Sequence, residues 1–397
     1  MVRYNGPIFD CDTHLYETDD AWTRHLPERY RRDWLVHWRD EGEGKKNLYI
    51  GDKRSAISDG YNFSDGSVPA PGKLHEWLKA TAQGKENIDF RVQPTADMHE
   101  PAARLRKMDE FGVEACILFI GHMVSVISYF DQADASHAAF HAYNQWLDEH
   151  WGFNYQDRIF ATPLLHLADL DRAVKEAEWA VKRGARVVVM PTGPAAHGKP
   201  AAHPDYDRFW AVLNEAGVKV SYHVSEAIYM RDHMAVWGEG MQQPRARATA
   251  FFWMHGYGER PVIETMSSFI FHNFFERFPR IKLLSAENGC EWVPNMLVKM
   301  DKCRGMARNS YWPCGQLRQR PSEIFKQHCK VVAYPEDDLK NMYEQTGSTD
   351  WIVMGSDYPH SEGVAEPRVF ADEACGGLSD EDTRRIMYDN GRDFIFS

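Results

Sequence analysis

The strongest constraint on the fold is an alternation of short apolar runs with longer segments of helical periodicity. Apolar runs at 115–120, 159–165 and 185–190 are each followed by a predicted helix, and the run at 218–223 is followed by an insertion and then a predicted helix. Strands that are apolar throughout are typical of a parallel sheet with helices on its faces. Counting an opening strand at 7–9, the chain contains eight such strand–helix units. Eight strands close a (β/α)8 barrel, so we predict an α/β fold of this class.

An open, doubly wound parallel sheet is the alternative fold. The first strand, however, is not followed by the GxGxxG pattern that dinucleotide-binding sheets of this kind carry. We therefore expect residues 1–397 to form a single barrel domain with insertions at about 18–95 and 225–260. The first insertion is punctuated by Gly, Ser and Asp and has one possible hairpin near 48–53. Long segments of this kind inside a compact domain usually have a functional role.

Composition excludes several classes of partner. The chain has 397 residues with 46 Lys and Arg against 58 Asp and Glu, a net charge of −12, which argues against nucleic-acid binding. We expect no membrane partner and no signal peptide, because no apolar run reaches transmembrane length and the first residues lack an apolar segment. The seven cysteines are scattered without a CxxC pair, which indicates a reducing, cytoplasmic location.

Polar residues gather where four of the predicted strands end, which is where barrels of this class carry their active sites. They are Asp10, Asp12 and His14 on the first strand, His223 on the fifth, Glu287 on the sixth, and Asp357 and His360 on the eighth. The alternate spacing of the first three places them on one face of an extended chain. A mixture of carboxylates and imidazoles suits a first-row divalent metal.

Several motifs give the chain a resemblance to a known family. The segments Asp10-Cys11-Asp12-Thr13-His14 and Gly355-Ser356-Asp357-Tyr358-Pro359-His360, together with His223, resemble the amidohydrolase superfamily. The similar branch holds aminocarboxymuconate-semialdehyde decarboxylase, γ-resorcylate decarboxylase and several hydrolases. The Gly-Ser-Asp-Tyr-Pro-His string is the most specific of these similarities, which extend over most of the chain from residue 98.

The resemblance implies that four residues bind the metal: Asp12, His14, His223 and Asp357. Asp12 replaces a histidine of the usual pattern, and Glu287 stands where a histidine usually ends the sixth strand. No lysine ends the fourth strand, so we expect one divalent ion, either zinc or, given the carboxylates, iron or manganese. A second ion held partly by Glu287 or Asp10 remains an alternative. We expect Glu287, a candidate ligand, to lie near the metal without binding it.

The implied reaction on a small carboxylated or carbonyl compound is hydrolysis by a metal-activated water or non-oxidative decarboxylation of a metal-chelated substrate. Asp357, His223 and His360 are the catalytic candidates: Asp357 transfers protons, His223 is a ligand, and His360 or His166 stabilises negative charge. A non-haem iron or manganese oxygenase subunit and an inactive structural partner subunit are the alternatives.

The second insertion is rich in aromatic residues, and we expect it to close over the substrate or to form a subunit contact. Its aromatic residues include Trp237, Phe251, Phe252 and Trp253. We predict a homo-oligomer or a paired complex with a related subunit, because exposed apolar patches usually find partners. Arg245 and Arg247 in the same insertion are candidates for pairing with a substrate carboxylate.

Overall fold

Eight parallel strands form the centre of the protein. The computed structural model describes residues 4–55, 63–85, 90–121, 132–195, 198–224, 228–239, 249–256 and 259–397. The barrel strands are β1 (Ile8–His14), β7 (Val113–Phe119), β8 (Ile159–Ala161), β9 (Val187–Val189), β10 (Lys219–His223), β11 (Leu283–Ala286), β12 (Cys329–Val332) and β13 (Ile352–Val353). Their side chains are almost entirely buried, as their apolar sequences require.

The strands follow one another around a closed barrel in sequence order. Hydrogen bonding joins them as β1-β7-β8 and as β13-β12-β11-β10-β9, with every pair parallel. Parallel bridges Thr13–Tyr358 and Leu164–Val189 join the two groups of strands. The predicted (β/α)8 barrel is therefore confirmed, and the open-sheet alternative is wrong.

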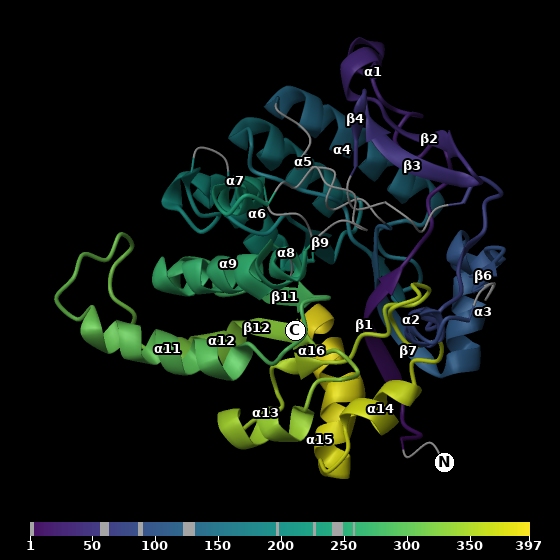
Figure 1. Ribbon diagram of the computed structural model, residues 1–397. Helices are drawn as coiled ribbons and strands as arrows, with labels where there is room; N and C mark the ends of the chain where they lie inside the picture. The colour runs from purple at the N-terminus through teal and green to yellow at the C-terminus, as the bar shows by residue number, and fades with distance from the viewer. Residues whose placement is uncertain are drawn as a thin grey trace.

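Helices surround the barrel and connect its strands (Figure 1). They are α3 (Pro101–Phe111), α4 (Ala133–His150), α5 (Leu170–Lys182), α6 (Asp207–Ala216), α9 (Glu259–Phe271), α10 (Phe274–Arg277), α11 (Val293–Met306), α12 (Pro321–His328), α13 (Leu339–Thr346), α14 (Val369–Ala374), α15 (Asp380–Arg384) and α16 (Asn390–Phe396). Pro101 as a helix start and Gly112 as a helix end predict a helix over 101–111, and α3 has these bounds, with Gly112 in a left-handed conformation (φ 72°).

The helical periodicity of residues 262–278 predicts one continuous helix, but the structure has two helices there. The chain breaks between α9 and α10 at Asn273, which has φ 48°. Asparagine adopts this left-handed conformation more readily than most residues other than glycine, and its Nδ2 donates to Glu276 Oε2 at 3.0 Å. Helical periodicity alone does not show such a break, because both halves keep apolar residues facing the barrel.

The first insertion contains more regular structure than its sequence suggests. Its elements are α1 (Glu28–Trp34), β2 (Val36–Gly42), β3 (Lys45–Ile50), β4 (Lys53–Arg54), β5 (Val68–Pro69), α2 (Leu74–Ala82) and β6 (Arg91–Val92). The hairpin expected near 48–53 is the β3–β4 pair. Figure 1 shows α1 beside α4, and Tyr30 of α1 donates to Asp134 Oδ2 of α4 at 3.0 Å.

The second insertion contributes α7 (Ile228–Val236) and α8 (Ala250–Gly256) to the described residues. Arg245 and Arg247 lie outside the described residues, as does the side chain of Trp253. Val236, Trp237 and Met254 are exposed, and the predicted oligomer stays a prediction. None of the helices within the described ranges has the length and apolar character needed to cross a membrane.

Candidate metal centre

The end of β1 presents Asp12 and His14 together. His14 is 1% exposed, and its Nδ1 donates to the carbonyl oxygen of Ile120 at 2.8 Å. This hydrogen bond leaves the Nε2 lone pair of the neutral ring directed at Asp12 Oδ1, 3.4 Å away. Burial lowers the pKa of His14 to about 3, so its ring is neutral at physiological pH. A neutral imidazole fixed in this way is a typical metal ligand.

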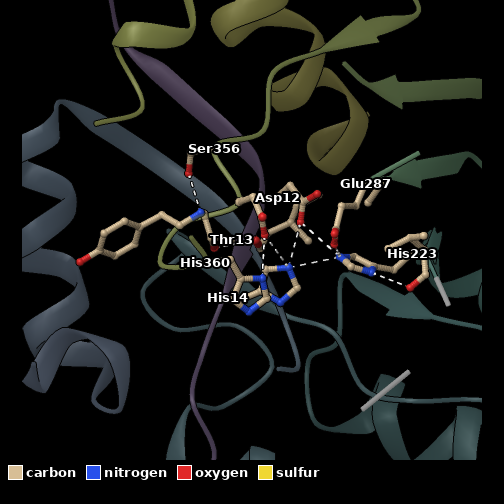
Figure 2. A network of polar contacts seen from close by, with 12 residues as sticks. Asp12, Thr13, His14, His223, Glu287, Ser356 and His360 are labelled. Carbon is tan, nitrogen blue, oxygen red and sulfur yellow. Dashed lines mark hydrogen bonds and ion pairs between the residues drawn. The ribbon is translucent and has the colours of Figure 1, made fainter. Parts of the chain in front are cut away.

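His223 at the end of β10 faces the same point. Its Nδ1 lies 3.1 Å from the carbonyl oxygen of Val224, and its Nε2 lies 3.2 Å from His14 Nε2 and 3.6 Å from Asp12 Oδ1 (Figure 2). Although burial favours the neutral ring, contacts with Asp12 and Glu287 raise the pKa of His223. A positive charge between the two rings is therefore stabilised by this environment.

Two carboxylates complete the cluster from the ends of β11 and β13. Asp357 Oδ1 lies 3.2 Å from His14 Nε2, and Glu287 Oε2 lies 3.2 Å from His223 Nε2. Both acidic residues have left-handed backbones, with φ 56° at Asp357 and 53° at Glu287. Such conformations are strained for these residues and cluster at functional sites, where surrounding structure enforces them.

The electrostatics of the cluster favour a cation. Burial raises the pKa of Asp357 and of Glu287 well above the ordinary carboxyl range. Burial opposes ionisation of Asp12 as well, but the contact with His223, whose own pKa is raised, outweighs burial and keeps the pKa of that carboxyl low. Carboxylates crowded in this way are stabilised when positive charge lies among them.

Two buried oxygens of the cluster identify what fits there. Asp12 Oδ1 and Asp357 Oδ1 accept no hydrogen bond, although both atoms are buried. Donor atoms of Asp12, His14 and His223 all lie within 4.8 Å of one another, as do those of His14, Asp357 and His360. Carboxylate and imidazole donors at this spacing fit a divalent metal ion, which would satisfy both oxygens and both facing ring nitrogens.

His360 lies beside the cluster and is positioned to exchange a proton with it. Its Nδ1 is 2.9 Å from Asp357 Oδ1. Its ring stacks on His14, with centroids 4.0 Å apart and planes 23° apart. The two atoms are close enough for proton transfer once they are aligned, although Asp357 Oδ1 accepts no hydrogen bond in this structure.

Other candidates lie away from this point. Asp10 belongs to none of the ligand groups among the described residues. A register irregularity between Asp10 and Thr13 interrupts the alternation of β1, and Asp10 Oδ1 accepts from the backbone N–H of Ser356 at 2.9 Å. His166 stacks on His137 instead, with ring centroids 3.8 Å apart.

Glu362 lines the same cavity but is not among the site residues predicted from the sequence. Donor atoms of Glu287, Asp357 and Glu362 lie within 4.8 Å of one another. The cavity has a volume of about 960 Å³, with apolar lining from Ile263, Val332 and Ala333. Its size suits a small organic substrate. Its position two residues after His360 is the sequence feature from which Glu362 could have been predicted as a site residue.

A family model described as Amidohydrolase matches residues 9–396. The match includes every residue of the cluster and, apart from Ile8, all eight barrel strands. The chain belongs to the amidohydrolase family.

Solved structures of similar fold agree with this assignment. An amidohydrolase from Mycobacterium avium subsp. paratuberculosis K-10 is 30% identical with a TM-score of 0.83, covering 99% of this chain and 100% of that chain. A dihydroxybenzoic acid decarboxylase from Polaromonas sp. JS666, with bound manganese and 2-nitroresorcinol, is 14% identical with a TM-score of 0.61, covering 98% and 97%. A 5-carboxyvanillate decarboxylase from Sphingomonas paucimobilis is 16% identical with a TM-score of 0.61, covering 98% and 99%. No curated protein sequence is a significant match.

Proposed function

We propose that this amidohydrolase-family protein is a divalent-metal-dependent enzyme that decarboxylates a small carboxylic acid without an oxidant. The observation that carries the proposal is the convergence of Asp12, His14, His223 and Asp357, with two facing ring nitrogens and two buried oxygens that accept no hydrogen bond. These four residues would hold the ion. Decarboxylation is favoured over other reactions because two similar folds belong to decarboxylases, one of them with bound manganese.

The residues of the chain have separate tasks in this reaction. A divalent ion held by these residues would stabilise negative charge on substrate oxygens and lower the pKa of bound water. Asp357 delivers the proton that replaces the lost carboxyl group, and His360, 2.9 Å from Asp357 Oδ1, resupplies it. The apolar walls of the cavity hold the carbon skeleton of the substrate and exclude water. Glu287 acts next to His223 rather than as a ligand.

Hydrolysis is the second candidate, favoured by the 30% identical amidohydrolase. The same pair then works in the opposite direction: Asp357 takes a proton from the attacking water and returns it to the leaving group. Both reactions use the same ligands, so the product distinguishes them.

The test begins with metal analysis of protein purified without added metal. The protein is then loaded with manganese or zinc and assayed with carboxyl-labelled dihydroxybenzoates and 5-carboxyvanillate, with aryl esters and lactones, and in an oxygen electrode. About one ion per chain with release of labelled carbon dioxide supports decarboxylation. Ester or lactone cleavage alone supports hydrolysis, whereas oxygen uptake supports an oxygenase. Failure to bind any divalent metal would contradict the proposal and favour a structural subunit.

A further inference from the structure

A single buried guanidinium holds the end of β1 from the side of α3. Arg104 is 2% exposed. Its Nη2 donates to the carbonyl oxygen of His14 at 2.6 Å, and its Nε donates to the carbonyl oxygen of Asp97 at 2.8 Å. Arg104 therefore bonds directly to the backbone of a residue whose side chain faces the metal centre.

The same guanidinium packs on the segment that carries Asp357. It lies over the ring of Tyr358, 5.3 Å from the centroid. The Tyr358 hydroxyl donates to Asp97 Oδ2 at 2.7 Å. Arg104 and Asp97 thus contact both strand ends from one small 3-10 helix (Ala96–Met98) and the first turn of α3.

The two strand ends are also bonded to each other at this place. His14 N–H donates to the carbonyl oxygen of Tyr358 at 2.7 Å, and Asp357 N–H donates to that of Asp12 at 2.8 Å. A displacement of either strand end would therefore move ligands from both strands. The left-handed backbone of Asp357 adds to the need for such support, since strained conformations persist only where neighbours enforce them.

The positive charge of Arg104 is unusual for a buried side chain that only fills space. Among the described residues, no carboxylate lies within ion-pair distance of its guanidinium, although the side chain is buried. A buried charge without a charged partner is costly, and an apolar side chain would fill the same volume more favourably. The gain that the structure shows is the pair of bonds to the carbonyl oxygens of His14 and Asp97.

We propose that Arg104 is a positioning residue that sets the orientation of His14 and Asp357 at the metal centre. This inference rests on the proposed function, because it assigns Arg104 a role in metal binding. Arg104 touches neither the ion site nor the substrate cavity and acts through the His14 carbonyl and the Tyr358 ring. Groups that orient ligands from behind typically change metal affinity 10–100-fold when removed.

The test compares Arg104→Met and Arg104→Lys with a matched control, Arg158→Met. Arg158 also donates to strand carbonyls, those of Glu114 at 2.7 Å and Val113 at 2.9 Å. These carbonyls lie at the start of β7, whereas the metal centre lies where the barrel strands end. Cobalt(II) affinity is measured by competition with a chromophoric chelator, and the d–d absorption of the cobalt protein reports ligand geometry. Thermal unfolding of the metal-free proteins measures stability separately.

We expect Arg104→Met to weaken cobalt binding about 10–100-fold and to change the d–d spectrum. Arg104→Lys should recover part of the affinity by donating one hydrogen bond. Arg158→Met should lower the unfolding temperature and leave affinity and spectrum unchanged. Wild-type affinity and spectrum in Arg104→Met, whatever its stability, would overturn the inference and leave Arg104 a packing residue.

Two milder variants keep the inference testable if Arg104→Met does not fold. Tyr358→Phe keeps the ring over the guanidinium and removes the hydroxyl bond to Asp97, and Asp97→Asn weakens the same bond. Each should reduce cobalt affinity with little loss of stability, and unchanged affinity in both would refute the positioning role. If the wild-type protein itself bound no cobalt, the proposed function would fail and this inference with it. If the wild-type protein binds cobalt and the variants bind it equally well, this inference fails and the proposed function stands.

Discussion

The protein has two stacked pairs of histidines whose ring geometries are alike and whose ring nitrogens have different partners. His14 and His360 have centroids 4.0 Å apart and planes 23° apart, and His137 and His166 have centroids 3.8 Å apart and planes 28° apart. Ring nitrogens of the first pair face carboxylates. In the second pair, His137 Nε2 accepts from the Asp169 N–H at 3.2 Å, and His166 Nδ1 accepts from the Ala168 N–H at 3.3 Å.

The difference shows that burial and stacking of imidazoles do not by themselves indicate a metal site. Burial lowers the pKa of His137 to about 4 and that of His166 well below its usual value, so both rings are neutral. The carboxylates of Asp169 and Glu176 only partly offset the effect of burial on His137, and neither His137 nor His166 belongs to a ligand group among the described residues. The carboxylates around His14 and His223 distinguish a candidate metal centre from a structural pair.

The largest effect should come from replacing residues at the candidate metal centre, whereas replacing the His137–His166 pair should leave metal binding intact. Asp357→Asn and His223→Ala should each lose bound metal or at least about 100-fold of activity, because each removes a donor atom. His137→Gln and His166→Asn keep the acceptor atoms that bond Asp169 and Ala168 and should retain the metal. Metal content and turnover of all four proteins are the measurements. Full metal content and turnover in both ligand variants would refute the assignment of the site.

The second prediction concerns acid stability. The pKa of His137 is about 4 in the folded protein against 6.5 in the unfolded chain. The unfolded chain therefore binds more protons as pH falls, and the stabilisation present above pH 6.5 is lost progressively towards pH 4. For His137 alone this loss amounts to about 3 kcal/mol.

Denaturant unfolding of the metal-free protein between pH 7 and pH 4 measures this effect. The double variant His137→Gln, His166→Asn should show a shallower decrease of unfolding free energy over the same range. Parallel decreases for the variant and the wild type would show that the pair contributes nothing to acid sensitivity.

The smallest expected effect tests whether Glu287 binds the metal or only lies beside the ligand His223. Glu287→Gln keeps the shape of a side chain whose Oε2 lies 3.2 Å from His223 Nε2. We expect it to retain the metal and to lose about tenfold of metal affinity or less, at the lower limit for groups that support a ligand. Loss of the metal to the extent seen with Asp357→Asn would make Glu287 a direct ligand, and the metal count per chain decides between the two.

Much of the fold could be predicted because the signals are local and repeated. Apolar runs gave the barrel strands, and Pro101 with Gly112 gave the bounds of α3. Shared strand ends then brought Asp12, His14, His223 and Asp357 together without any knowledge of distances. The break at Asn273 was missed because an asparagine in a left-handed conformation is not distinguished by sequence from one in a helix.

What the sequence could not show depends on contacts between distant segments. Alternation along β1 placed Asp10 with Asp12, but the register irregularity and the bond to Ser356 separate them. His166 was a candidate for stabilising charge, and only the structure shows it stacked on His137. Arg104 resembled any arginine of an amphipathic helix, because its bond to the His14 carbonyl spans 90 residues.

The bonds between the ends of β1 and β13 have a consequence for when this protein can acquire its metal. Asp10 accepts a hydrogen bond from Ser356, 346 residues later in the chain. During synthesis, the first ligands leave the ribosome long before Asp357 is made, so no nascent barrel can present the full donor set. Closing so long a loop must precede binding, and binding then favours the closed form. Metal uptake would therefore report completion of the barrel, and chains stalled before β13 would compete poorly for scarce ions in the cell.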